Sequence, residues 1–171
     1  NNSNFRLVPD ADGHVWGLDW PVMMVDHHCA KAYAEWLSTK QGHQWRLPHE
    51  LEWEKSARGV DERRFVWGDG FDPSYCCMRH SHKDEMLPST VNNFPIDCSI
   101  YGVRGLTGNM MDWTESIITD DWSGVDLDQN KLQIKQIDEI DSMRVIRGGS
   151  WGMDKDGLHT FRRKRYTPHQ R

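Results

Sequence analysis

The chain has 171 residues, of which 37% are hydrophobic, and it contains nine tryptophans. That length supports one sizeable hydrophobic core and predicts a single domain over residues 1–171. The formal net charge of −5 argues against a nucleic-acid partner or an anionic membrane surface, because binding to either needs a positive field. No apolar run approaches the roughly 18 residues that span a bilayer, so no membrane span is predicted.

The first residues indicate whether the chain is part of a longer protein, and the cysteines indicate its redox compartment. The opening NNSNF has neither an initiator methionine nor a signal peptide, so we expect a fragment of a longer protein. Cys29, Cys76, Cys77 and Cys98 are too few and too irregularly spaced for a disulfide framework, and adjacent cysteines cannot easily bridge each other. A reducing, cytoplasmic location is the resulting expectation.

Two segments in the first sixty residues have helical signals. In 26–42 (DHHCAKAYAEWLSTKQG), Asp26 can cap the start, Gly42 can end the helix, and apolar residues recur with a helical period. In 46–59 (RLPHELEWEKSARG), Pro48 suits the first turn, and the glutamates that follow favour the positive end of a helix. The sequence predicts one helix over each segment.

Beyond residue 59 the chain is rich in turn-forming residues, with only short apolar pieces between them. Residues 143–151 (MRVIRGGSW) alternate briefly and then reach a Gly-Gly pair, which predicts a short strand ending at a tight bend. Residues 116–142 are acidic with little periodicity, and we interpret them as a surface insertion with one helical turn near Leu132–Ile137. Regular secondary structure is therefore expected to be sparse.

Five pieces of the chain, taken together and in order, carry a resemblance to a known family: PVMMVDHHCAKAYAEWLS (21–38), WRLPHELEWEKSARG (45–59), VWGD (66–69), YGVRGLTGNMMDWTES (101–116) and RVIRGGSW (144–151). They resemble the formylglycine-generating enzymes, also called sulfatase-modifying-factor domains. The resemblance implies an α+β fold, a variant of the C-type lectin fold with two helices and short strands. In detail, the chain is similar to the family domains attached to bacterial serine/threonine kinases, although no kinase motif occurs in it.

The oxidase members of this family use two cysteines after the Gly-Gly-Ser segment to bind copper and to oxidise a substrate cysteine to formylglycine. The resemblance places those positions at Met153 and Leu158. A thioether is only a weak, neutral copper ligand, and a leucine is none. Cys76 and Cys77 lie in a different segment and do not restore the pair by a small shift. We therefore predict no catalytic residues in this chain.

The family resemblance also implies calcium sites built from backbone carbonyls and acidic side chains. The carbonyls of Gly108 and Met110 and the carboxylate of Asp112 match one such site, but Gly105 stands where the family usually has Asn or Asp. At a second site, Cys77 stands in place of an asparagine. Calcium prefers about six to eight oxygen ligands, so these departures weaken both sites. We expect no resident cofactor, with weakly bound calcium as the alternative.

Nine histidines invite a metal interpretation. His27 and His28 are neighbours on a predicted helix and point in different directions, whereas His80 and His82 could share a face of an extended strand. No set of three ligands has standard spacing, so hydrogen-bonded or surface histidines are favoured over an iron or zinc site. The sulfoxide synthases of this family hold iron with three histidines from a separate upstream domain, and RYTPHQR (165–171) loosely resembles one of their arginine and aromatic segments.

The end of the chain gives two further expectations. The run RRKR (162–165) would alternate between faces in a strand, so we expect structural arginines that pair with acidic neighbours, not a basic patch. Family members usually finish with a Gly-Phe-Arg strand, and this sequence reaches Arg171 without one. We expect that final strand to be lacking here.

Three functions from different classes remain open. The one we favour is a non-oxidase ligand- or protein-binding module, appended to a catalytic or signalling domain such as a serine/threonine kinase, or a variable protein of a diversity-generating retroelement. The second is the C-terminal domain of a non-haem iron sulfoxide synthase. The third is a divergent formylglycine-generating oxidase that uses other cysteines.

Gly148 and Gly149 allow a bend that delivers the residues after them to one loop face. Six side chains there mix apolar, charged and imidazole groups without a nucleophile and base pair, and we call them the strip: Trp151, Met153, Asp154, Lys155, Asp156 and His159. Aromatic and methionine side chains supply apolar contact area to a partner, and the charged side chains fix the orientation of that partner. The predicted partner is therefore a peptide or protein and not a small cofactor.

Overall fold

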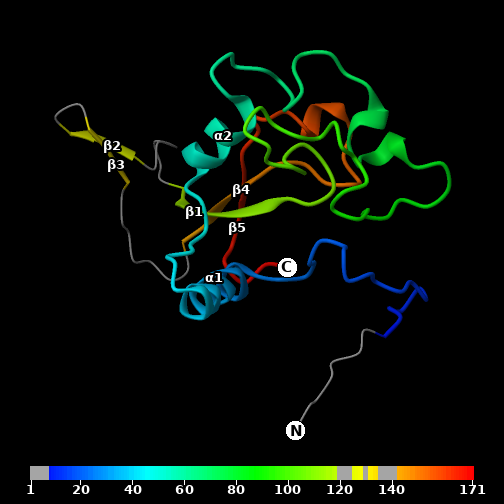
Figure 1. The fold of residues 1–171 in the computed structure, drawn as a ribbon, viewed down its shortest axis with the longest axis horizontal. Helices are drawn as coiled ribbons and strands as arrows, with labels where there is room; N and C mark the ends of the chain where they lie inside the picture. Colours follow the sequence, from blue (N-terminus) through cyan, green and yellow to red (C-terminus); the bar gives the residue numbers. More distant parts are fainter. Residues whose placement is uncertain (1–7, 119–124, 129–130, 135–141) are drawn as a thin grey trace, which may run out of the picture.

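The computed structural model describes residues 8–118, 125–128, 131–134 and 142–171 (Figure 1). Its elements in chain order are the helices α1 (His27–Gln41) and α2 (Glu50–Arg58), the 3-10 turns η1 (Pro73–Tyr75) and η2 (Arg79–Ser81), the strands β1 (Asp112–Ile117), β2 (Val125–Asp128), β3 (Lys131–Ile134) and β4 (Arg144–Arg147), the turn η3 (Lys155–Gly157) and the strand β5 (Lys164–Tyr166). The prediction of an α+β fold with two helices and short strands is confirmed. None of the described helices combines the length and the apolar character needed to cross a membrane.

Helix α1 has the ends that the sequence predicts. The Asp26 carboxylate accepts a hydrogen bond from the backbone N–H of Cys29 at 2.8 Å, which satisfies one free donor of the first turn. At the other end, Gly42 adopts a left-handed conformation with φ of 71° and donates its N–H to the carbonyl of Ser38. Both caps are local features of the sequence, and this explains why the helix limits could be predicted.

Helix α2 starts later than predicted. Pro48 is not in its first turn, because His49 is the N-cap and Glu50 is the first helical residue. The His49 ring accepts from the N–H of Leu51 at 3.2 Å, while the Glu52 carboxylate accepts from the N–H of His49 at 2.8 Å. This reciprocal capping box sets the start of the helix. The carbonyl of Pro48, outside the helix, accepts from Glu115 of β1.

Strands β1, β4 and β5 form an antiparallel sheet in the order β1-β4-β5. Its central row joins Trp113 to Ile146 and Ile146 to Lys164. Strand β4 ends at Arg147, and the next residue, Gly148, has a φ of +80°, in the left-handed region that glycine tolerates. The predicted short strand and bend within 143–151 are thus confirmed.

The two faces of this sheet have different neighbours. Toward α2, Asp112 accepts from the indole N–H of Trp53 at 2.8 Å. On the opposite face, the indole N–H of Trp113 donates to the carbonyl of Val25, and its ring lies 5.6 Å from that of His27. Figure 1 accordingly shows the sheet between α2 and α1.

Two apolar clusters and a set of buried ion pairs hold these layers together. The first cluster comprises Trp53, Ala57, Val66 and Leu106, and the second comprises Phe65, Cys76, Met78 and Leu158. Arg163 donates two hydrogen bonds, at 2.5 and 2.6 Å, to buried Glu50 of α2, and fully buried Arg147 pairs with Glu54. The predicted structural role of the arginines in 162–165 is confirmed for Arg163.

The predicted helical turn near Leu132–Ile137 is wrong over the residues that the structure describes. Lys131–Ile134 form strand β3, which pairs antiparallel with β2 in the register Leu127 with Leu132. The sequences VDLD and KLQI alternate polar and apolar residues with a period of two, which is typical of paired strands. Residues 135–137, like much of the predicted 116–142 insertion, lie outside the described residues.

Candidate functional site

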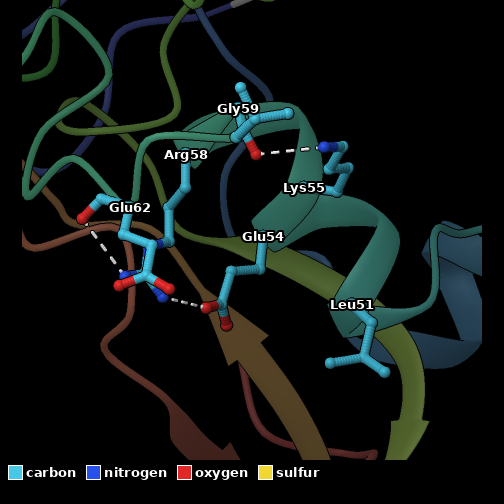
Figure 2. A pocket seen from close by; sticks show the side chains of 7 residues that line it. Leu51, Glu54, Lys55, Arg58, Gly59 and Glu62 are labelled. Carbon is cyan, nitrogen blue, oxygen red and sulfur yellow. Dashed lines mark hydrogen bonds and ion pairs between the residues drawn. The ribbon is translucent and has the colours of Figure 1, made fainter.

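A polar pocket of about 420 Å³ lies beside α2, lined by Leu51, Glu54, Lys55, Arg58, Gly59, Val60 and Glu62. Figure 2 shows that three of its charged side chains, Glu54, Lys55 and Arg58, are already engaged with one another or with the backbone. Arg58 bonds to Glu54 at 2.6 Å and to the carbonyl of Glu62, and Lys55 bonds to the carbonyl of Gly59. These cations contribute to the local fold, so the pocket offers little unsatisfied charge to a ligand.

A second pocket, of about 220 Å³, lies on the α1 side of the sheet, and we call it the apolar pocket. Its walls come from four stretches that are far apart in the sequence: Val22, Met23, Met24, Val25, Met110, Met111, Trp113, Ile146, Ser150, Trp151, Tyr166, Gln170 and Arg171. Methionine and aromatic walls with a few polar groups are typical of ligand-binding hollows, because thioethers adapt to the shape of the occupant.

The strip begins at this pocket and then turns away from it. Trp151 lines the pocket and is fixed by a backbone hydrogen bond from its N–H to the carbonyl of Asn109. Met153 is half-buried and packs against the second core cluster, which contains fully buried Leu158. The first two strip residues therefore have different surroundings, one in a hollow and one against the core.

The remaining strip residues lie in η3 or next to it. Asp154 is exposed and bonds to His80 at 3.0 Å, and exposed Lys155 places its ammonium 5.1 Å from the ring centre of Phe71. Exposed Asp156 accepts from Arg162 through its carbonyl. His159 is half-buried and packs its ring between Phe65 and Phe161. Asp154, Lys155 and Asp156 are thus exposed, although Asp154 also pairs with Arg79 at 3.3 Å, whereas Met153 and His159 are used in packing.

The positions matched to the oxidase cysteines are part of the core. Leu158 is completely buried, and the sulfur of Met153 lies 2.9 Å from the ammonium of Lys164. Cys76 and Cys77 are also buried, and burial raises the pKa of the Cys77 thiol to about 11 and that of Cys76 further. Without a metal, a thiol with so high a pKa carries almost no thiolate at neutral pH, so it is a poor nucleophile toward a substrate.

The residues at the predicted calcium position fit that ion poorly. The carbonyl of Gly108 accepts from the N–H of Met110 at 2.8 Å, and one carboxylate oxygen of Asp112 accepts from Trp53. Gly105 has no side chain to add a ligand, and the sulfur of Cys77 is directed toward His82 and the carbonyl of Leu87. Calcium binding at Gly108, Met110 and Asp112 therefore stays a prediction of weak affinity.

The histidines do not assemble into a three-histidine metal site within the described ranges. His80 and His82 were expected to be able to share a strand face, but η2 is a 3-10 turn, so His80 contacts Asp154 while His82 approaches Cys77. Burial lowers the pKa of His27 to about 4, with Arg144 contributing, so this ring is neutral at pH 7. Hydrogen-bonded and packed histidines account for these positions.

One group of possible ligands escaped the sequence reasoning. Asp10, Asp12 and His14 place ligand atoms within 4.8 Å of one another. The Asp10 carboxylate, however, already accepts from the N–H groups of Asp12 and His14 and from the indole of Trp16. The D-x-D-x-H spacing could have identified this group in the sequence, and in the structure its residues form a hydrogen-bonded turn.

Sequence reasoning also missed Lys164, which was assigned only to a run of structural cations. Its ammonium lies between the sulfurs of Met111 and Met153, at 3.7 and 2.9 Å. Burial lowers the pKa of Lys164, and Arg162 contributes to the decrease. The signal that could have identified the surroundings of this lysine is the pair of adjacent methionines at 110–111, since Met111 reaches both the lysine and the apolar pocket.

Comparison with known proteins identifies the class of this domain. The family model for the sulfatase-modifying factor enzyme 1-like domain matches residues 11–171, and the chain belongs to this family. Two solved structures share its fold: PvdO from Pseudomonas aeruginosa has a TM-score of 0.74 at 25% identity, covering 92% of this chain and 60% of that one. Treponema denticola variable protein 1 has a TM-score of 0.68 at 22% identity, with 99% and 73% coverage.

Among curated proteins, three relatives have different names. Hercynine oxygenase from Mycolicibacterium smegmatis is 31% identical over 82% of this chain and 33% of its own length. Serine/threonine-protein kinase pkn1 from Chlamydia caviae is 30% identical over 86% of this chain and 22% of its own. Inactive C-alpha-formylglycine-generating enzyme 2 from Bos taurus is 31% identical over 85% and 43%. The chain spans less than half the length of each.

Proposed function

We propose that this domain is a non-oxidase member of its family that binds a peptide or protein through the apolar pocket and the exposed part of the strip. The observation that carries the proposal is the burial of Leu158 at one oxidase position, beside core-packed Met153 at the other. Neither side chain can carry copper-thiolate chemistry. The apolar pocket and exposed Asp154 and Lys155 supply contact area and charge for recognition.

The relatives support a role as a module within a larger protein. One is named a serine/threonine-protein kinase of which this chain matches 22%, which is the arrangement expected for an appended recognition domain. Another is named an inactive formylglycine-generating enzyme, so the family includes members described as lacking that activity. A fold shared by proteins of such different names requires that the function be sought in the residues of the site.

A second candidate function is the C-terminal domain of a sulfoxide synthase. The specific observation in its favour is the 31% identity with hercynine oxygenase over 82% of this chain. The iron ligands implied for such an enzyme belong to a separate upstream domain. Sequencing the complete gene tests this candidate, because a three-histidine domain upstream would support it and a kinase domain would support an appended binding module.

Peptide-display selection against the purified domain tests the binding function. A variant with Trp151→Ala, Asp154→Ala and Lys155→Ala should lose the selected peptides while keeping its circular dichroism spectrum. The matched control is Glu35→Ala, Trp36→Ala and Lys40→Ala, because it removes the same kinds of side chain from the exposed face of α1. The control should keep the selected peptides.

Two outcomes would contradict the proposal. Peptide capture that survives the triple substitution in the strip would move the binding face elsewhere on the domain. Conversion of a Cys-x-Pro-x-Arg peptide to an aldehyde, together with copper(I) binding that is lost when Cys76 and Cys77 are serine, would make the domain a divergent oxidase.

A further inference from the structure

Lys164 does not itself line the apolar pocket, but it lies on the same face of the sheet and contacts Met111, which does. Residues paired across antiparallel strands point to the same side, and Trp113, Ile146 and Lys164 form one such row. Trp113 and Ile146 both line the apolar pocket. The lysine side chain therefore extends over the same face of the sheet as the pocket.

The ammonium group of Lys164 has no anionic partner within the described part of the chain. Its contacts are the sulfurs of Met111, at 3.7 Å, and Met153, at 2.9 Å. A thioether is a weak acceptor that cannot neutralise an ammonium, so this half-buried cation keeps most of its desolvation cost. Burial accordingly lowers the pKa of Lys164. This contrasts with Arg163 next to it, which is paired with Glu50.

The pocket itself adds no negative side chain. The residues that line it, all within the described ranges, include Arg171 but neither aspartate nor glutamate. Arg171 makes a 3.7 Å contact to Asp26. In a chain whose formal net charge is −5, this hollow is apolar with cations at its edge. An occupant with an apolar group and a negative charge close together complements it.

We propose that the apolar pocket captures the C-terminal residue of a peptide, with the terminal carboxylate on Lys164 and an apolar side chain between the methionines and Trp151. An internal apolar residue has no charge of its own, whereas at a C-terminus the carboxylate and the side chain share one Cα atom. A pocket of about 220 Å³ holds a single residue of this kind, and the preceding residues leave through its opening. This inference rests on the proposed peptide-binding function and specifies its ligand.

Titration calorimetry with short peptides tests the assignment. The probes are acetyl-Gly-Gly-Gly-Phe with a free carboxylate, the same peptide as its amide, and acetyl-Gly-Phe-Gly-Gly with a free carboxylate. We expect the first to bind about tenfold or more tightly than the other two, because only it places the charge and the ring on one residue. The total tryptophan fluorescence, to which the pocket-lining Trp113 and Trp151 contribute, gives an independent readout.

The variant Lys164→Met should reduce binding of the free-carboxylate peptide to the level of the amide while leaving the amide unchanged. Its melting temperature should not fall, because the substitution removes a half-buried cation without an anionic partner. Lys164→Arg, which keeps the charge, should retain the preference for the carboxylate. Lys83→Met removes an exposed lysine and is the control that should change neither peptide.

Several results would overturn the assignment. Equal affinity for the free-carboxylate peptide and its amide would contradict the role of Lys164 but leave the proposed peptide binding intact. The same conclusion would follow if display-selected peptides bound Lys164→Met as tightly as the wild type. Equal affinity for N-acetylphenylalanine and the tetrapeptide would make the pocket a site for small free acids. Loss of peptides in the strip variant, with no binding of any C-terminal probe, would place recognition on the strip alone.

Discussion

Asp112 is a carboxylic acid whose chemistry the fold alters strongly. Burial raises the pKa of its carboxyl from 3.8 to about 6, against the hydrogen bond from Trp53, and the nearby carboxylate of Asp97 adds to the increase. In the unfolded chain the same group ionises near its ordinary pKa. The folded state therefore holds the proton more strongly between about pH 4 and pH 6. The stability gained from that proton is present below pH 4 and lost as the pH rises through 6.

Asp112→Asn should remove this pH dependence, because the amide oxygen can still accept from Trp53 but does not titrate. Relative to the variant, the free energy of unfolding of the wild type should fall by about 1–3 kcal/mol between pH 4 and pH 7. Urea denaturation at several pH values measures the difference. Asp154→Asn on the exposed η3 loop serves as the control. If the difference in the free energy of unfolding between the wild type and Asp112→Asn did not change with pH, the prediction would be wrong.

The predicted calcium affinity also depends on a single residue. With Gly105 in place of an asparagine or aspartate, calcium should bind with millimolar or weaker affinity and raise the melting temperature by less than about 2 °C at about 1 mM. Gly105 has a φ of +73° and free space around the position of an added Cβ, so Gly105→Asn is tolerated and should strengthen binding. A large shift in the wild type at low calcium, lost in Asp112→Ala, would show that the ligand set is already sufficient.

Side-chain direction limits what the sequence predicts about single residues. The spacing after Gly149 correctly marks a loop next to a bend, but it does not tell that Trp151 lines a pocket while Met153 packs on the core. In an irregular segment no helical or strand period fixes the direction of successive side chains. For the same reason, the position of Lys164 between Met111 and Met153 required the structure.

Two ion pairs made by helix α2 differ strongly in their exposure to solvent. Glu50 is 2% exposed and Arg163 23%, whereas Arg46 and Glu52 at the start of the helix are 61% and 49% exposed. Arg163→Ala leaves a carboxylate buried without its main partner and should destabilise the domain by about 3–5 kcal/mol. Arg46→Ala breaks a solvated pair and should cost less than about 1 kcal/mol.

Chemical denaturation of the two variants measures this contrast. Arg163→Met is a useful third variant, because it keeps the length and packing of the side chain without the charge. If the charge pair matters, it should be nearly as unstable as Arg163→Ala. Equal, small effects at Arg46 and Arg163 would mean that the α2 contacts depend on apolar packing and not on ion pairs.

Helices and strands differed in how well the sequence predicted them. The caps of α1 at Asp26 and Gly42 are contacts within a few residues, so local reasoning locates both ends. The β2–β3 hairpin and the β1-β4-β5 order depend on pairing between strands, and a single short alternating segment does not specify its partner. The resemblance to a known family, and not the periodicity, predicted the fold class, and neither predicted the order in which these strands pair.

At the scale of the whole molecule, the apolar pocket is formed only when four distant stretches meet. Residues 22–25 reach it from before α1, and 166–171 reach it from after β5. No local sequence pattern predicts that these four stretches come together, although the adjacent pairs Met23–Met24 and Met110–Met111 supply part of the pocket lining. The pocket therefore exists only in the assembled fold, and its ligand binding should report on global folding.

The four cysteines allow that assembled state to be tested as a unit. Cys29 is exposed and Cys98 is half-buried, whereas Cys76 and Cys77 are buried and burial raises the pKa of both thiols. Iodoacetamide should therefore alkylate Cys29 quickly and Cys98 more slowly, because the thiolate is the reacting species. Cys76 and Cys77 should react only as the domain unfolds, at one common rate.

Mass spectrometry of the alkylated peptides, in buffer and in increasing urea, measures the four sites separately. In full denaturant all four should react at similar rates, which is the control for intrinsic reactivity. Cys77→Ser should leave the rapid native labelling unchanged, because that labelling belongs to Cys29. Rapid modification of Cys77 in buffer would mean that its thiol is accessible and partly ionised. The domain would then hold a reactive cysteine beside His82, 3.7 Å away, which would favour a divergent oxidase that uses other cysteines.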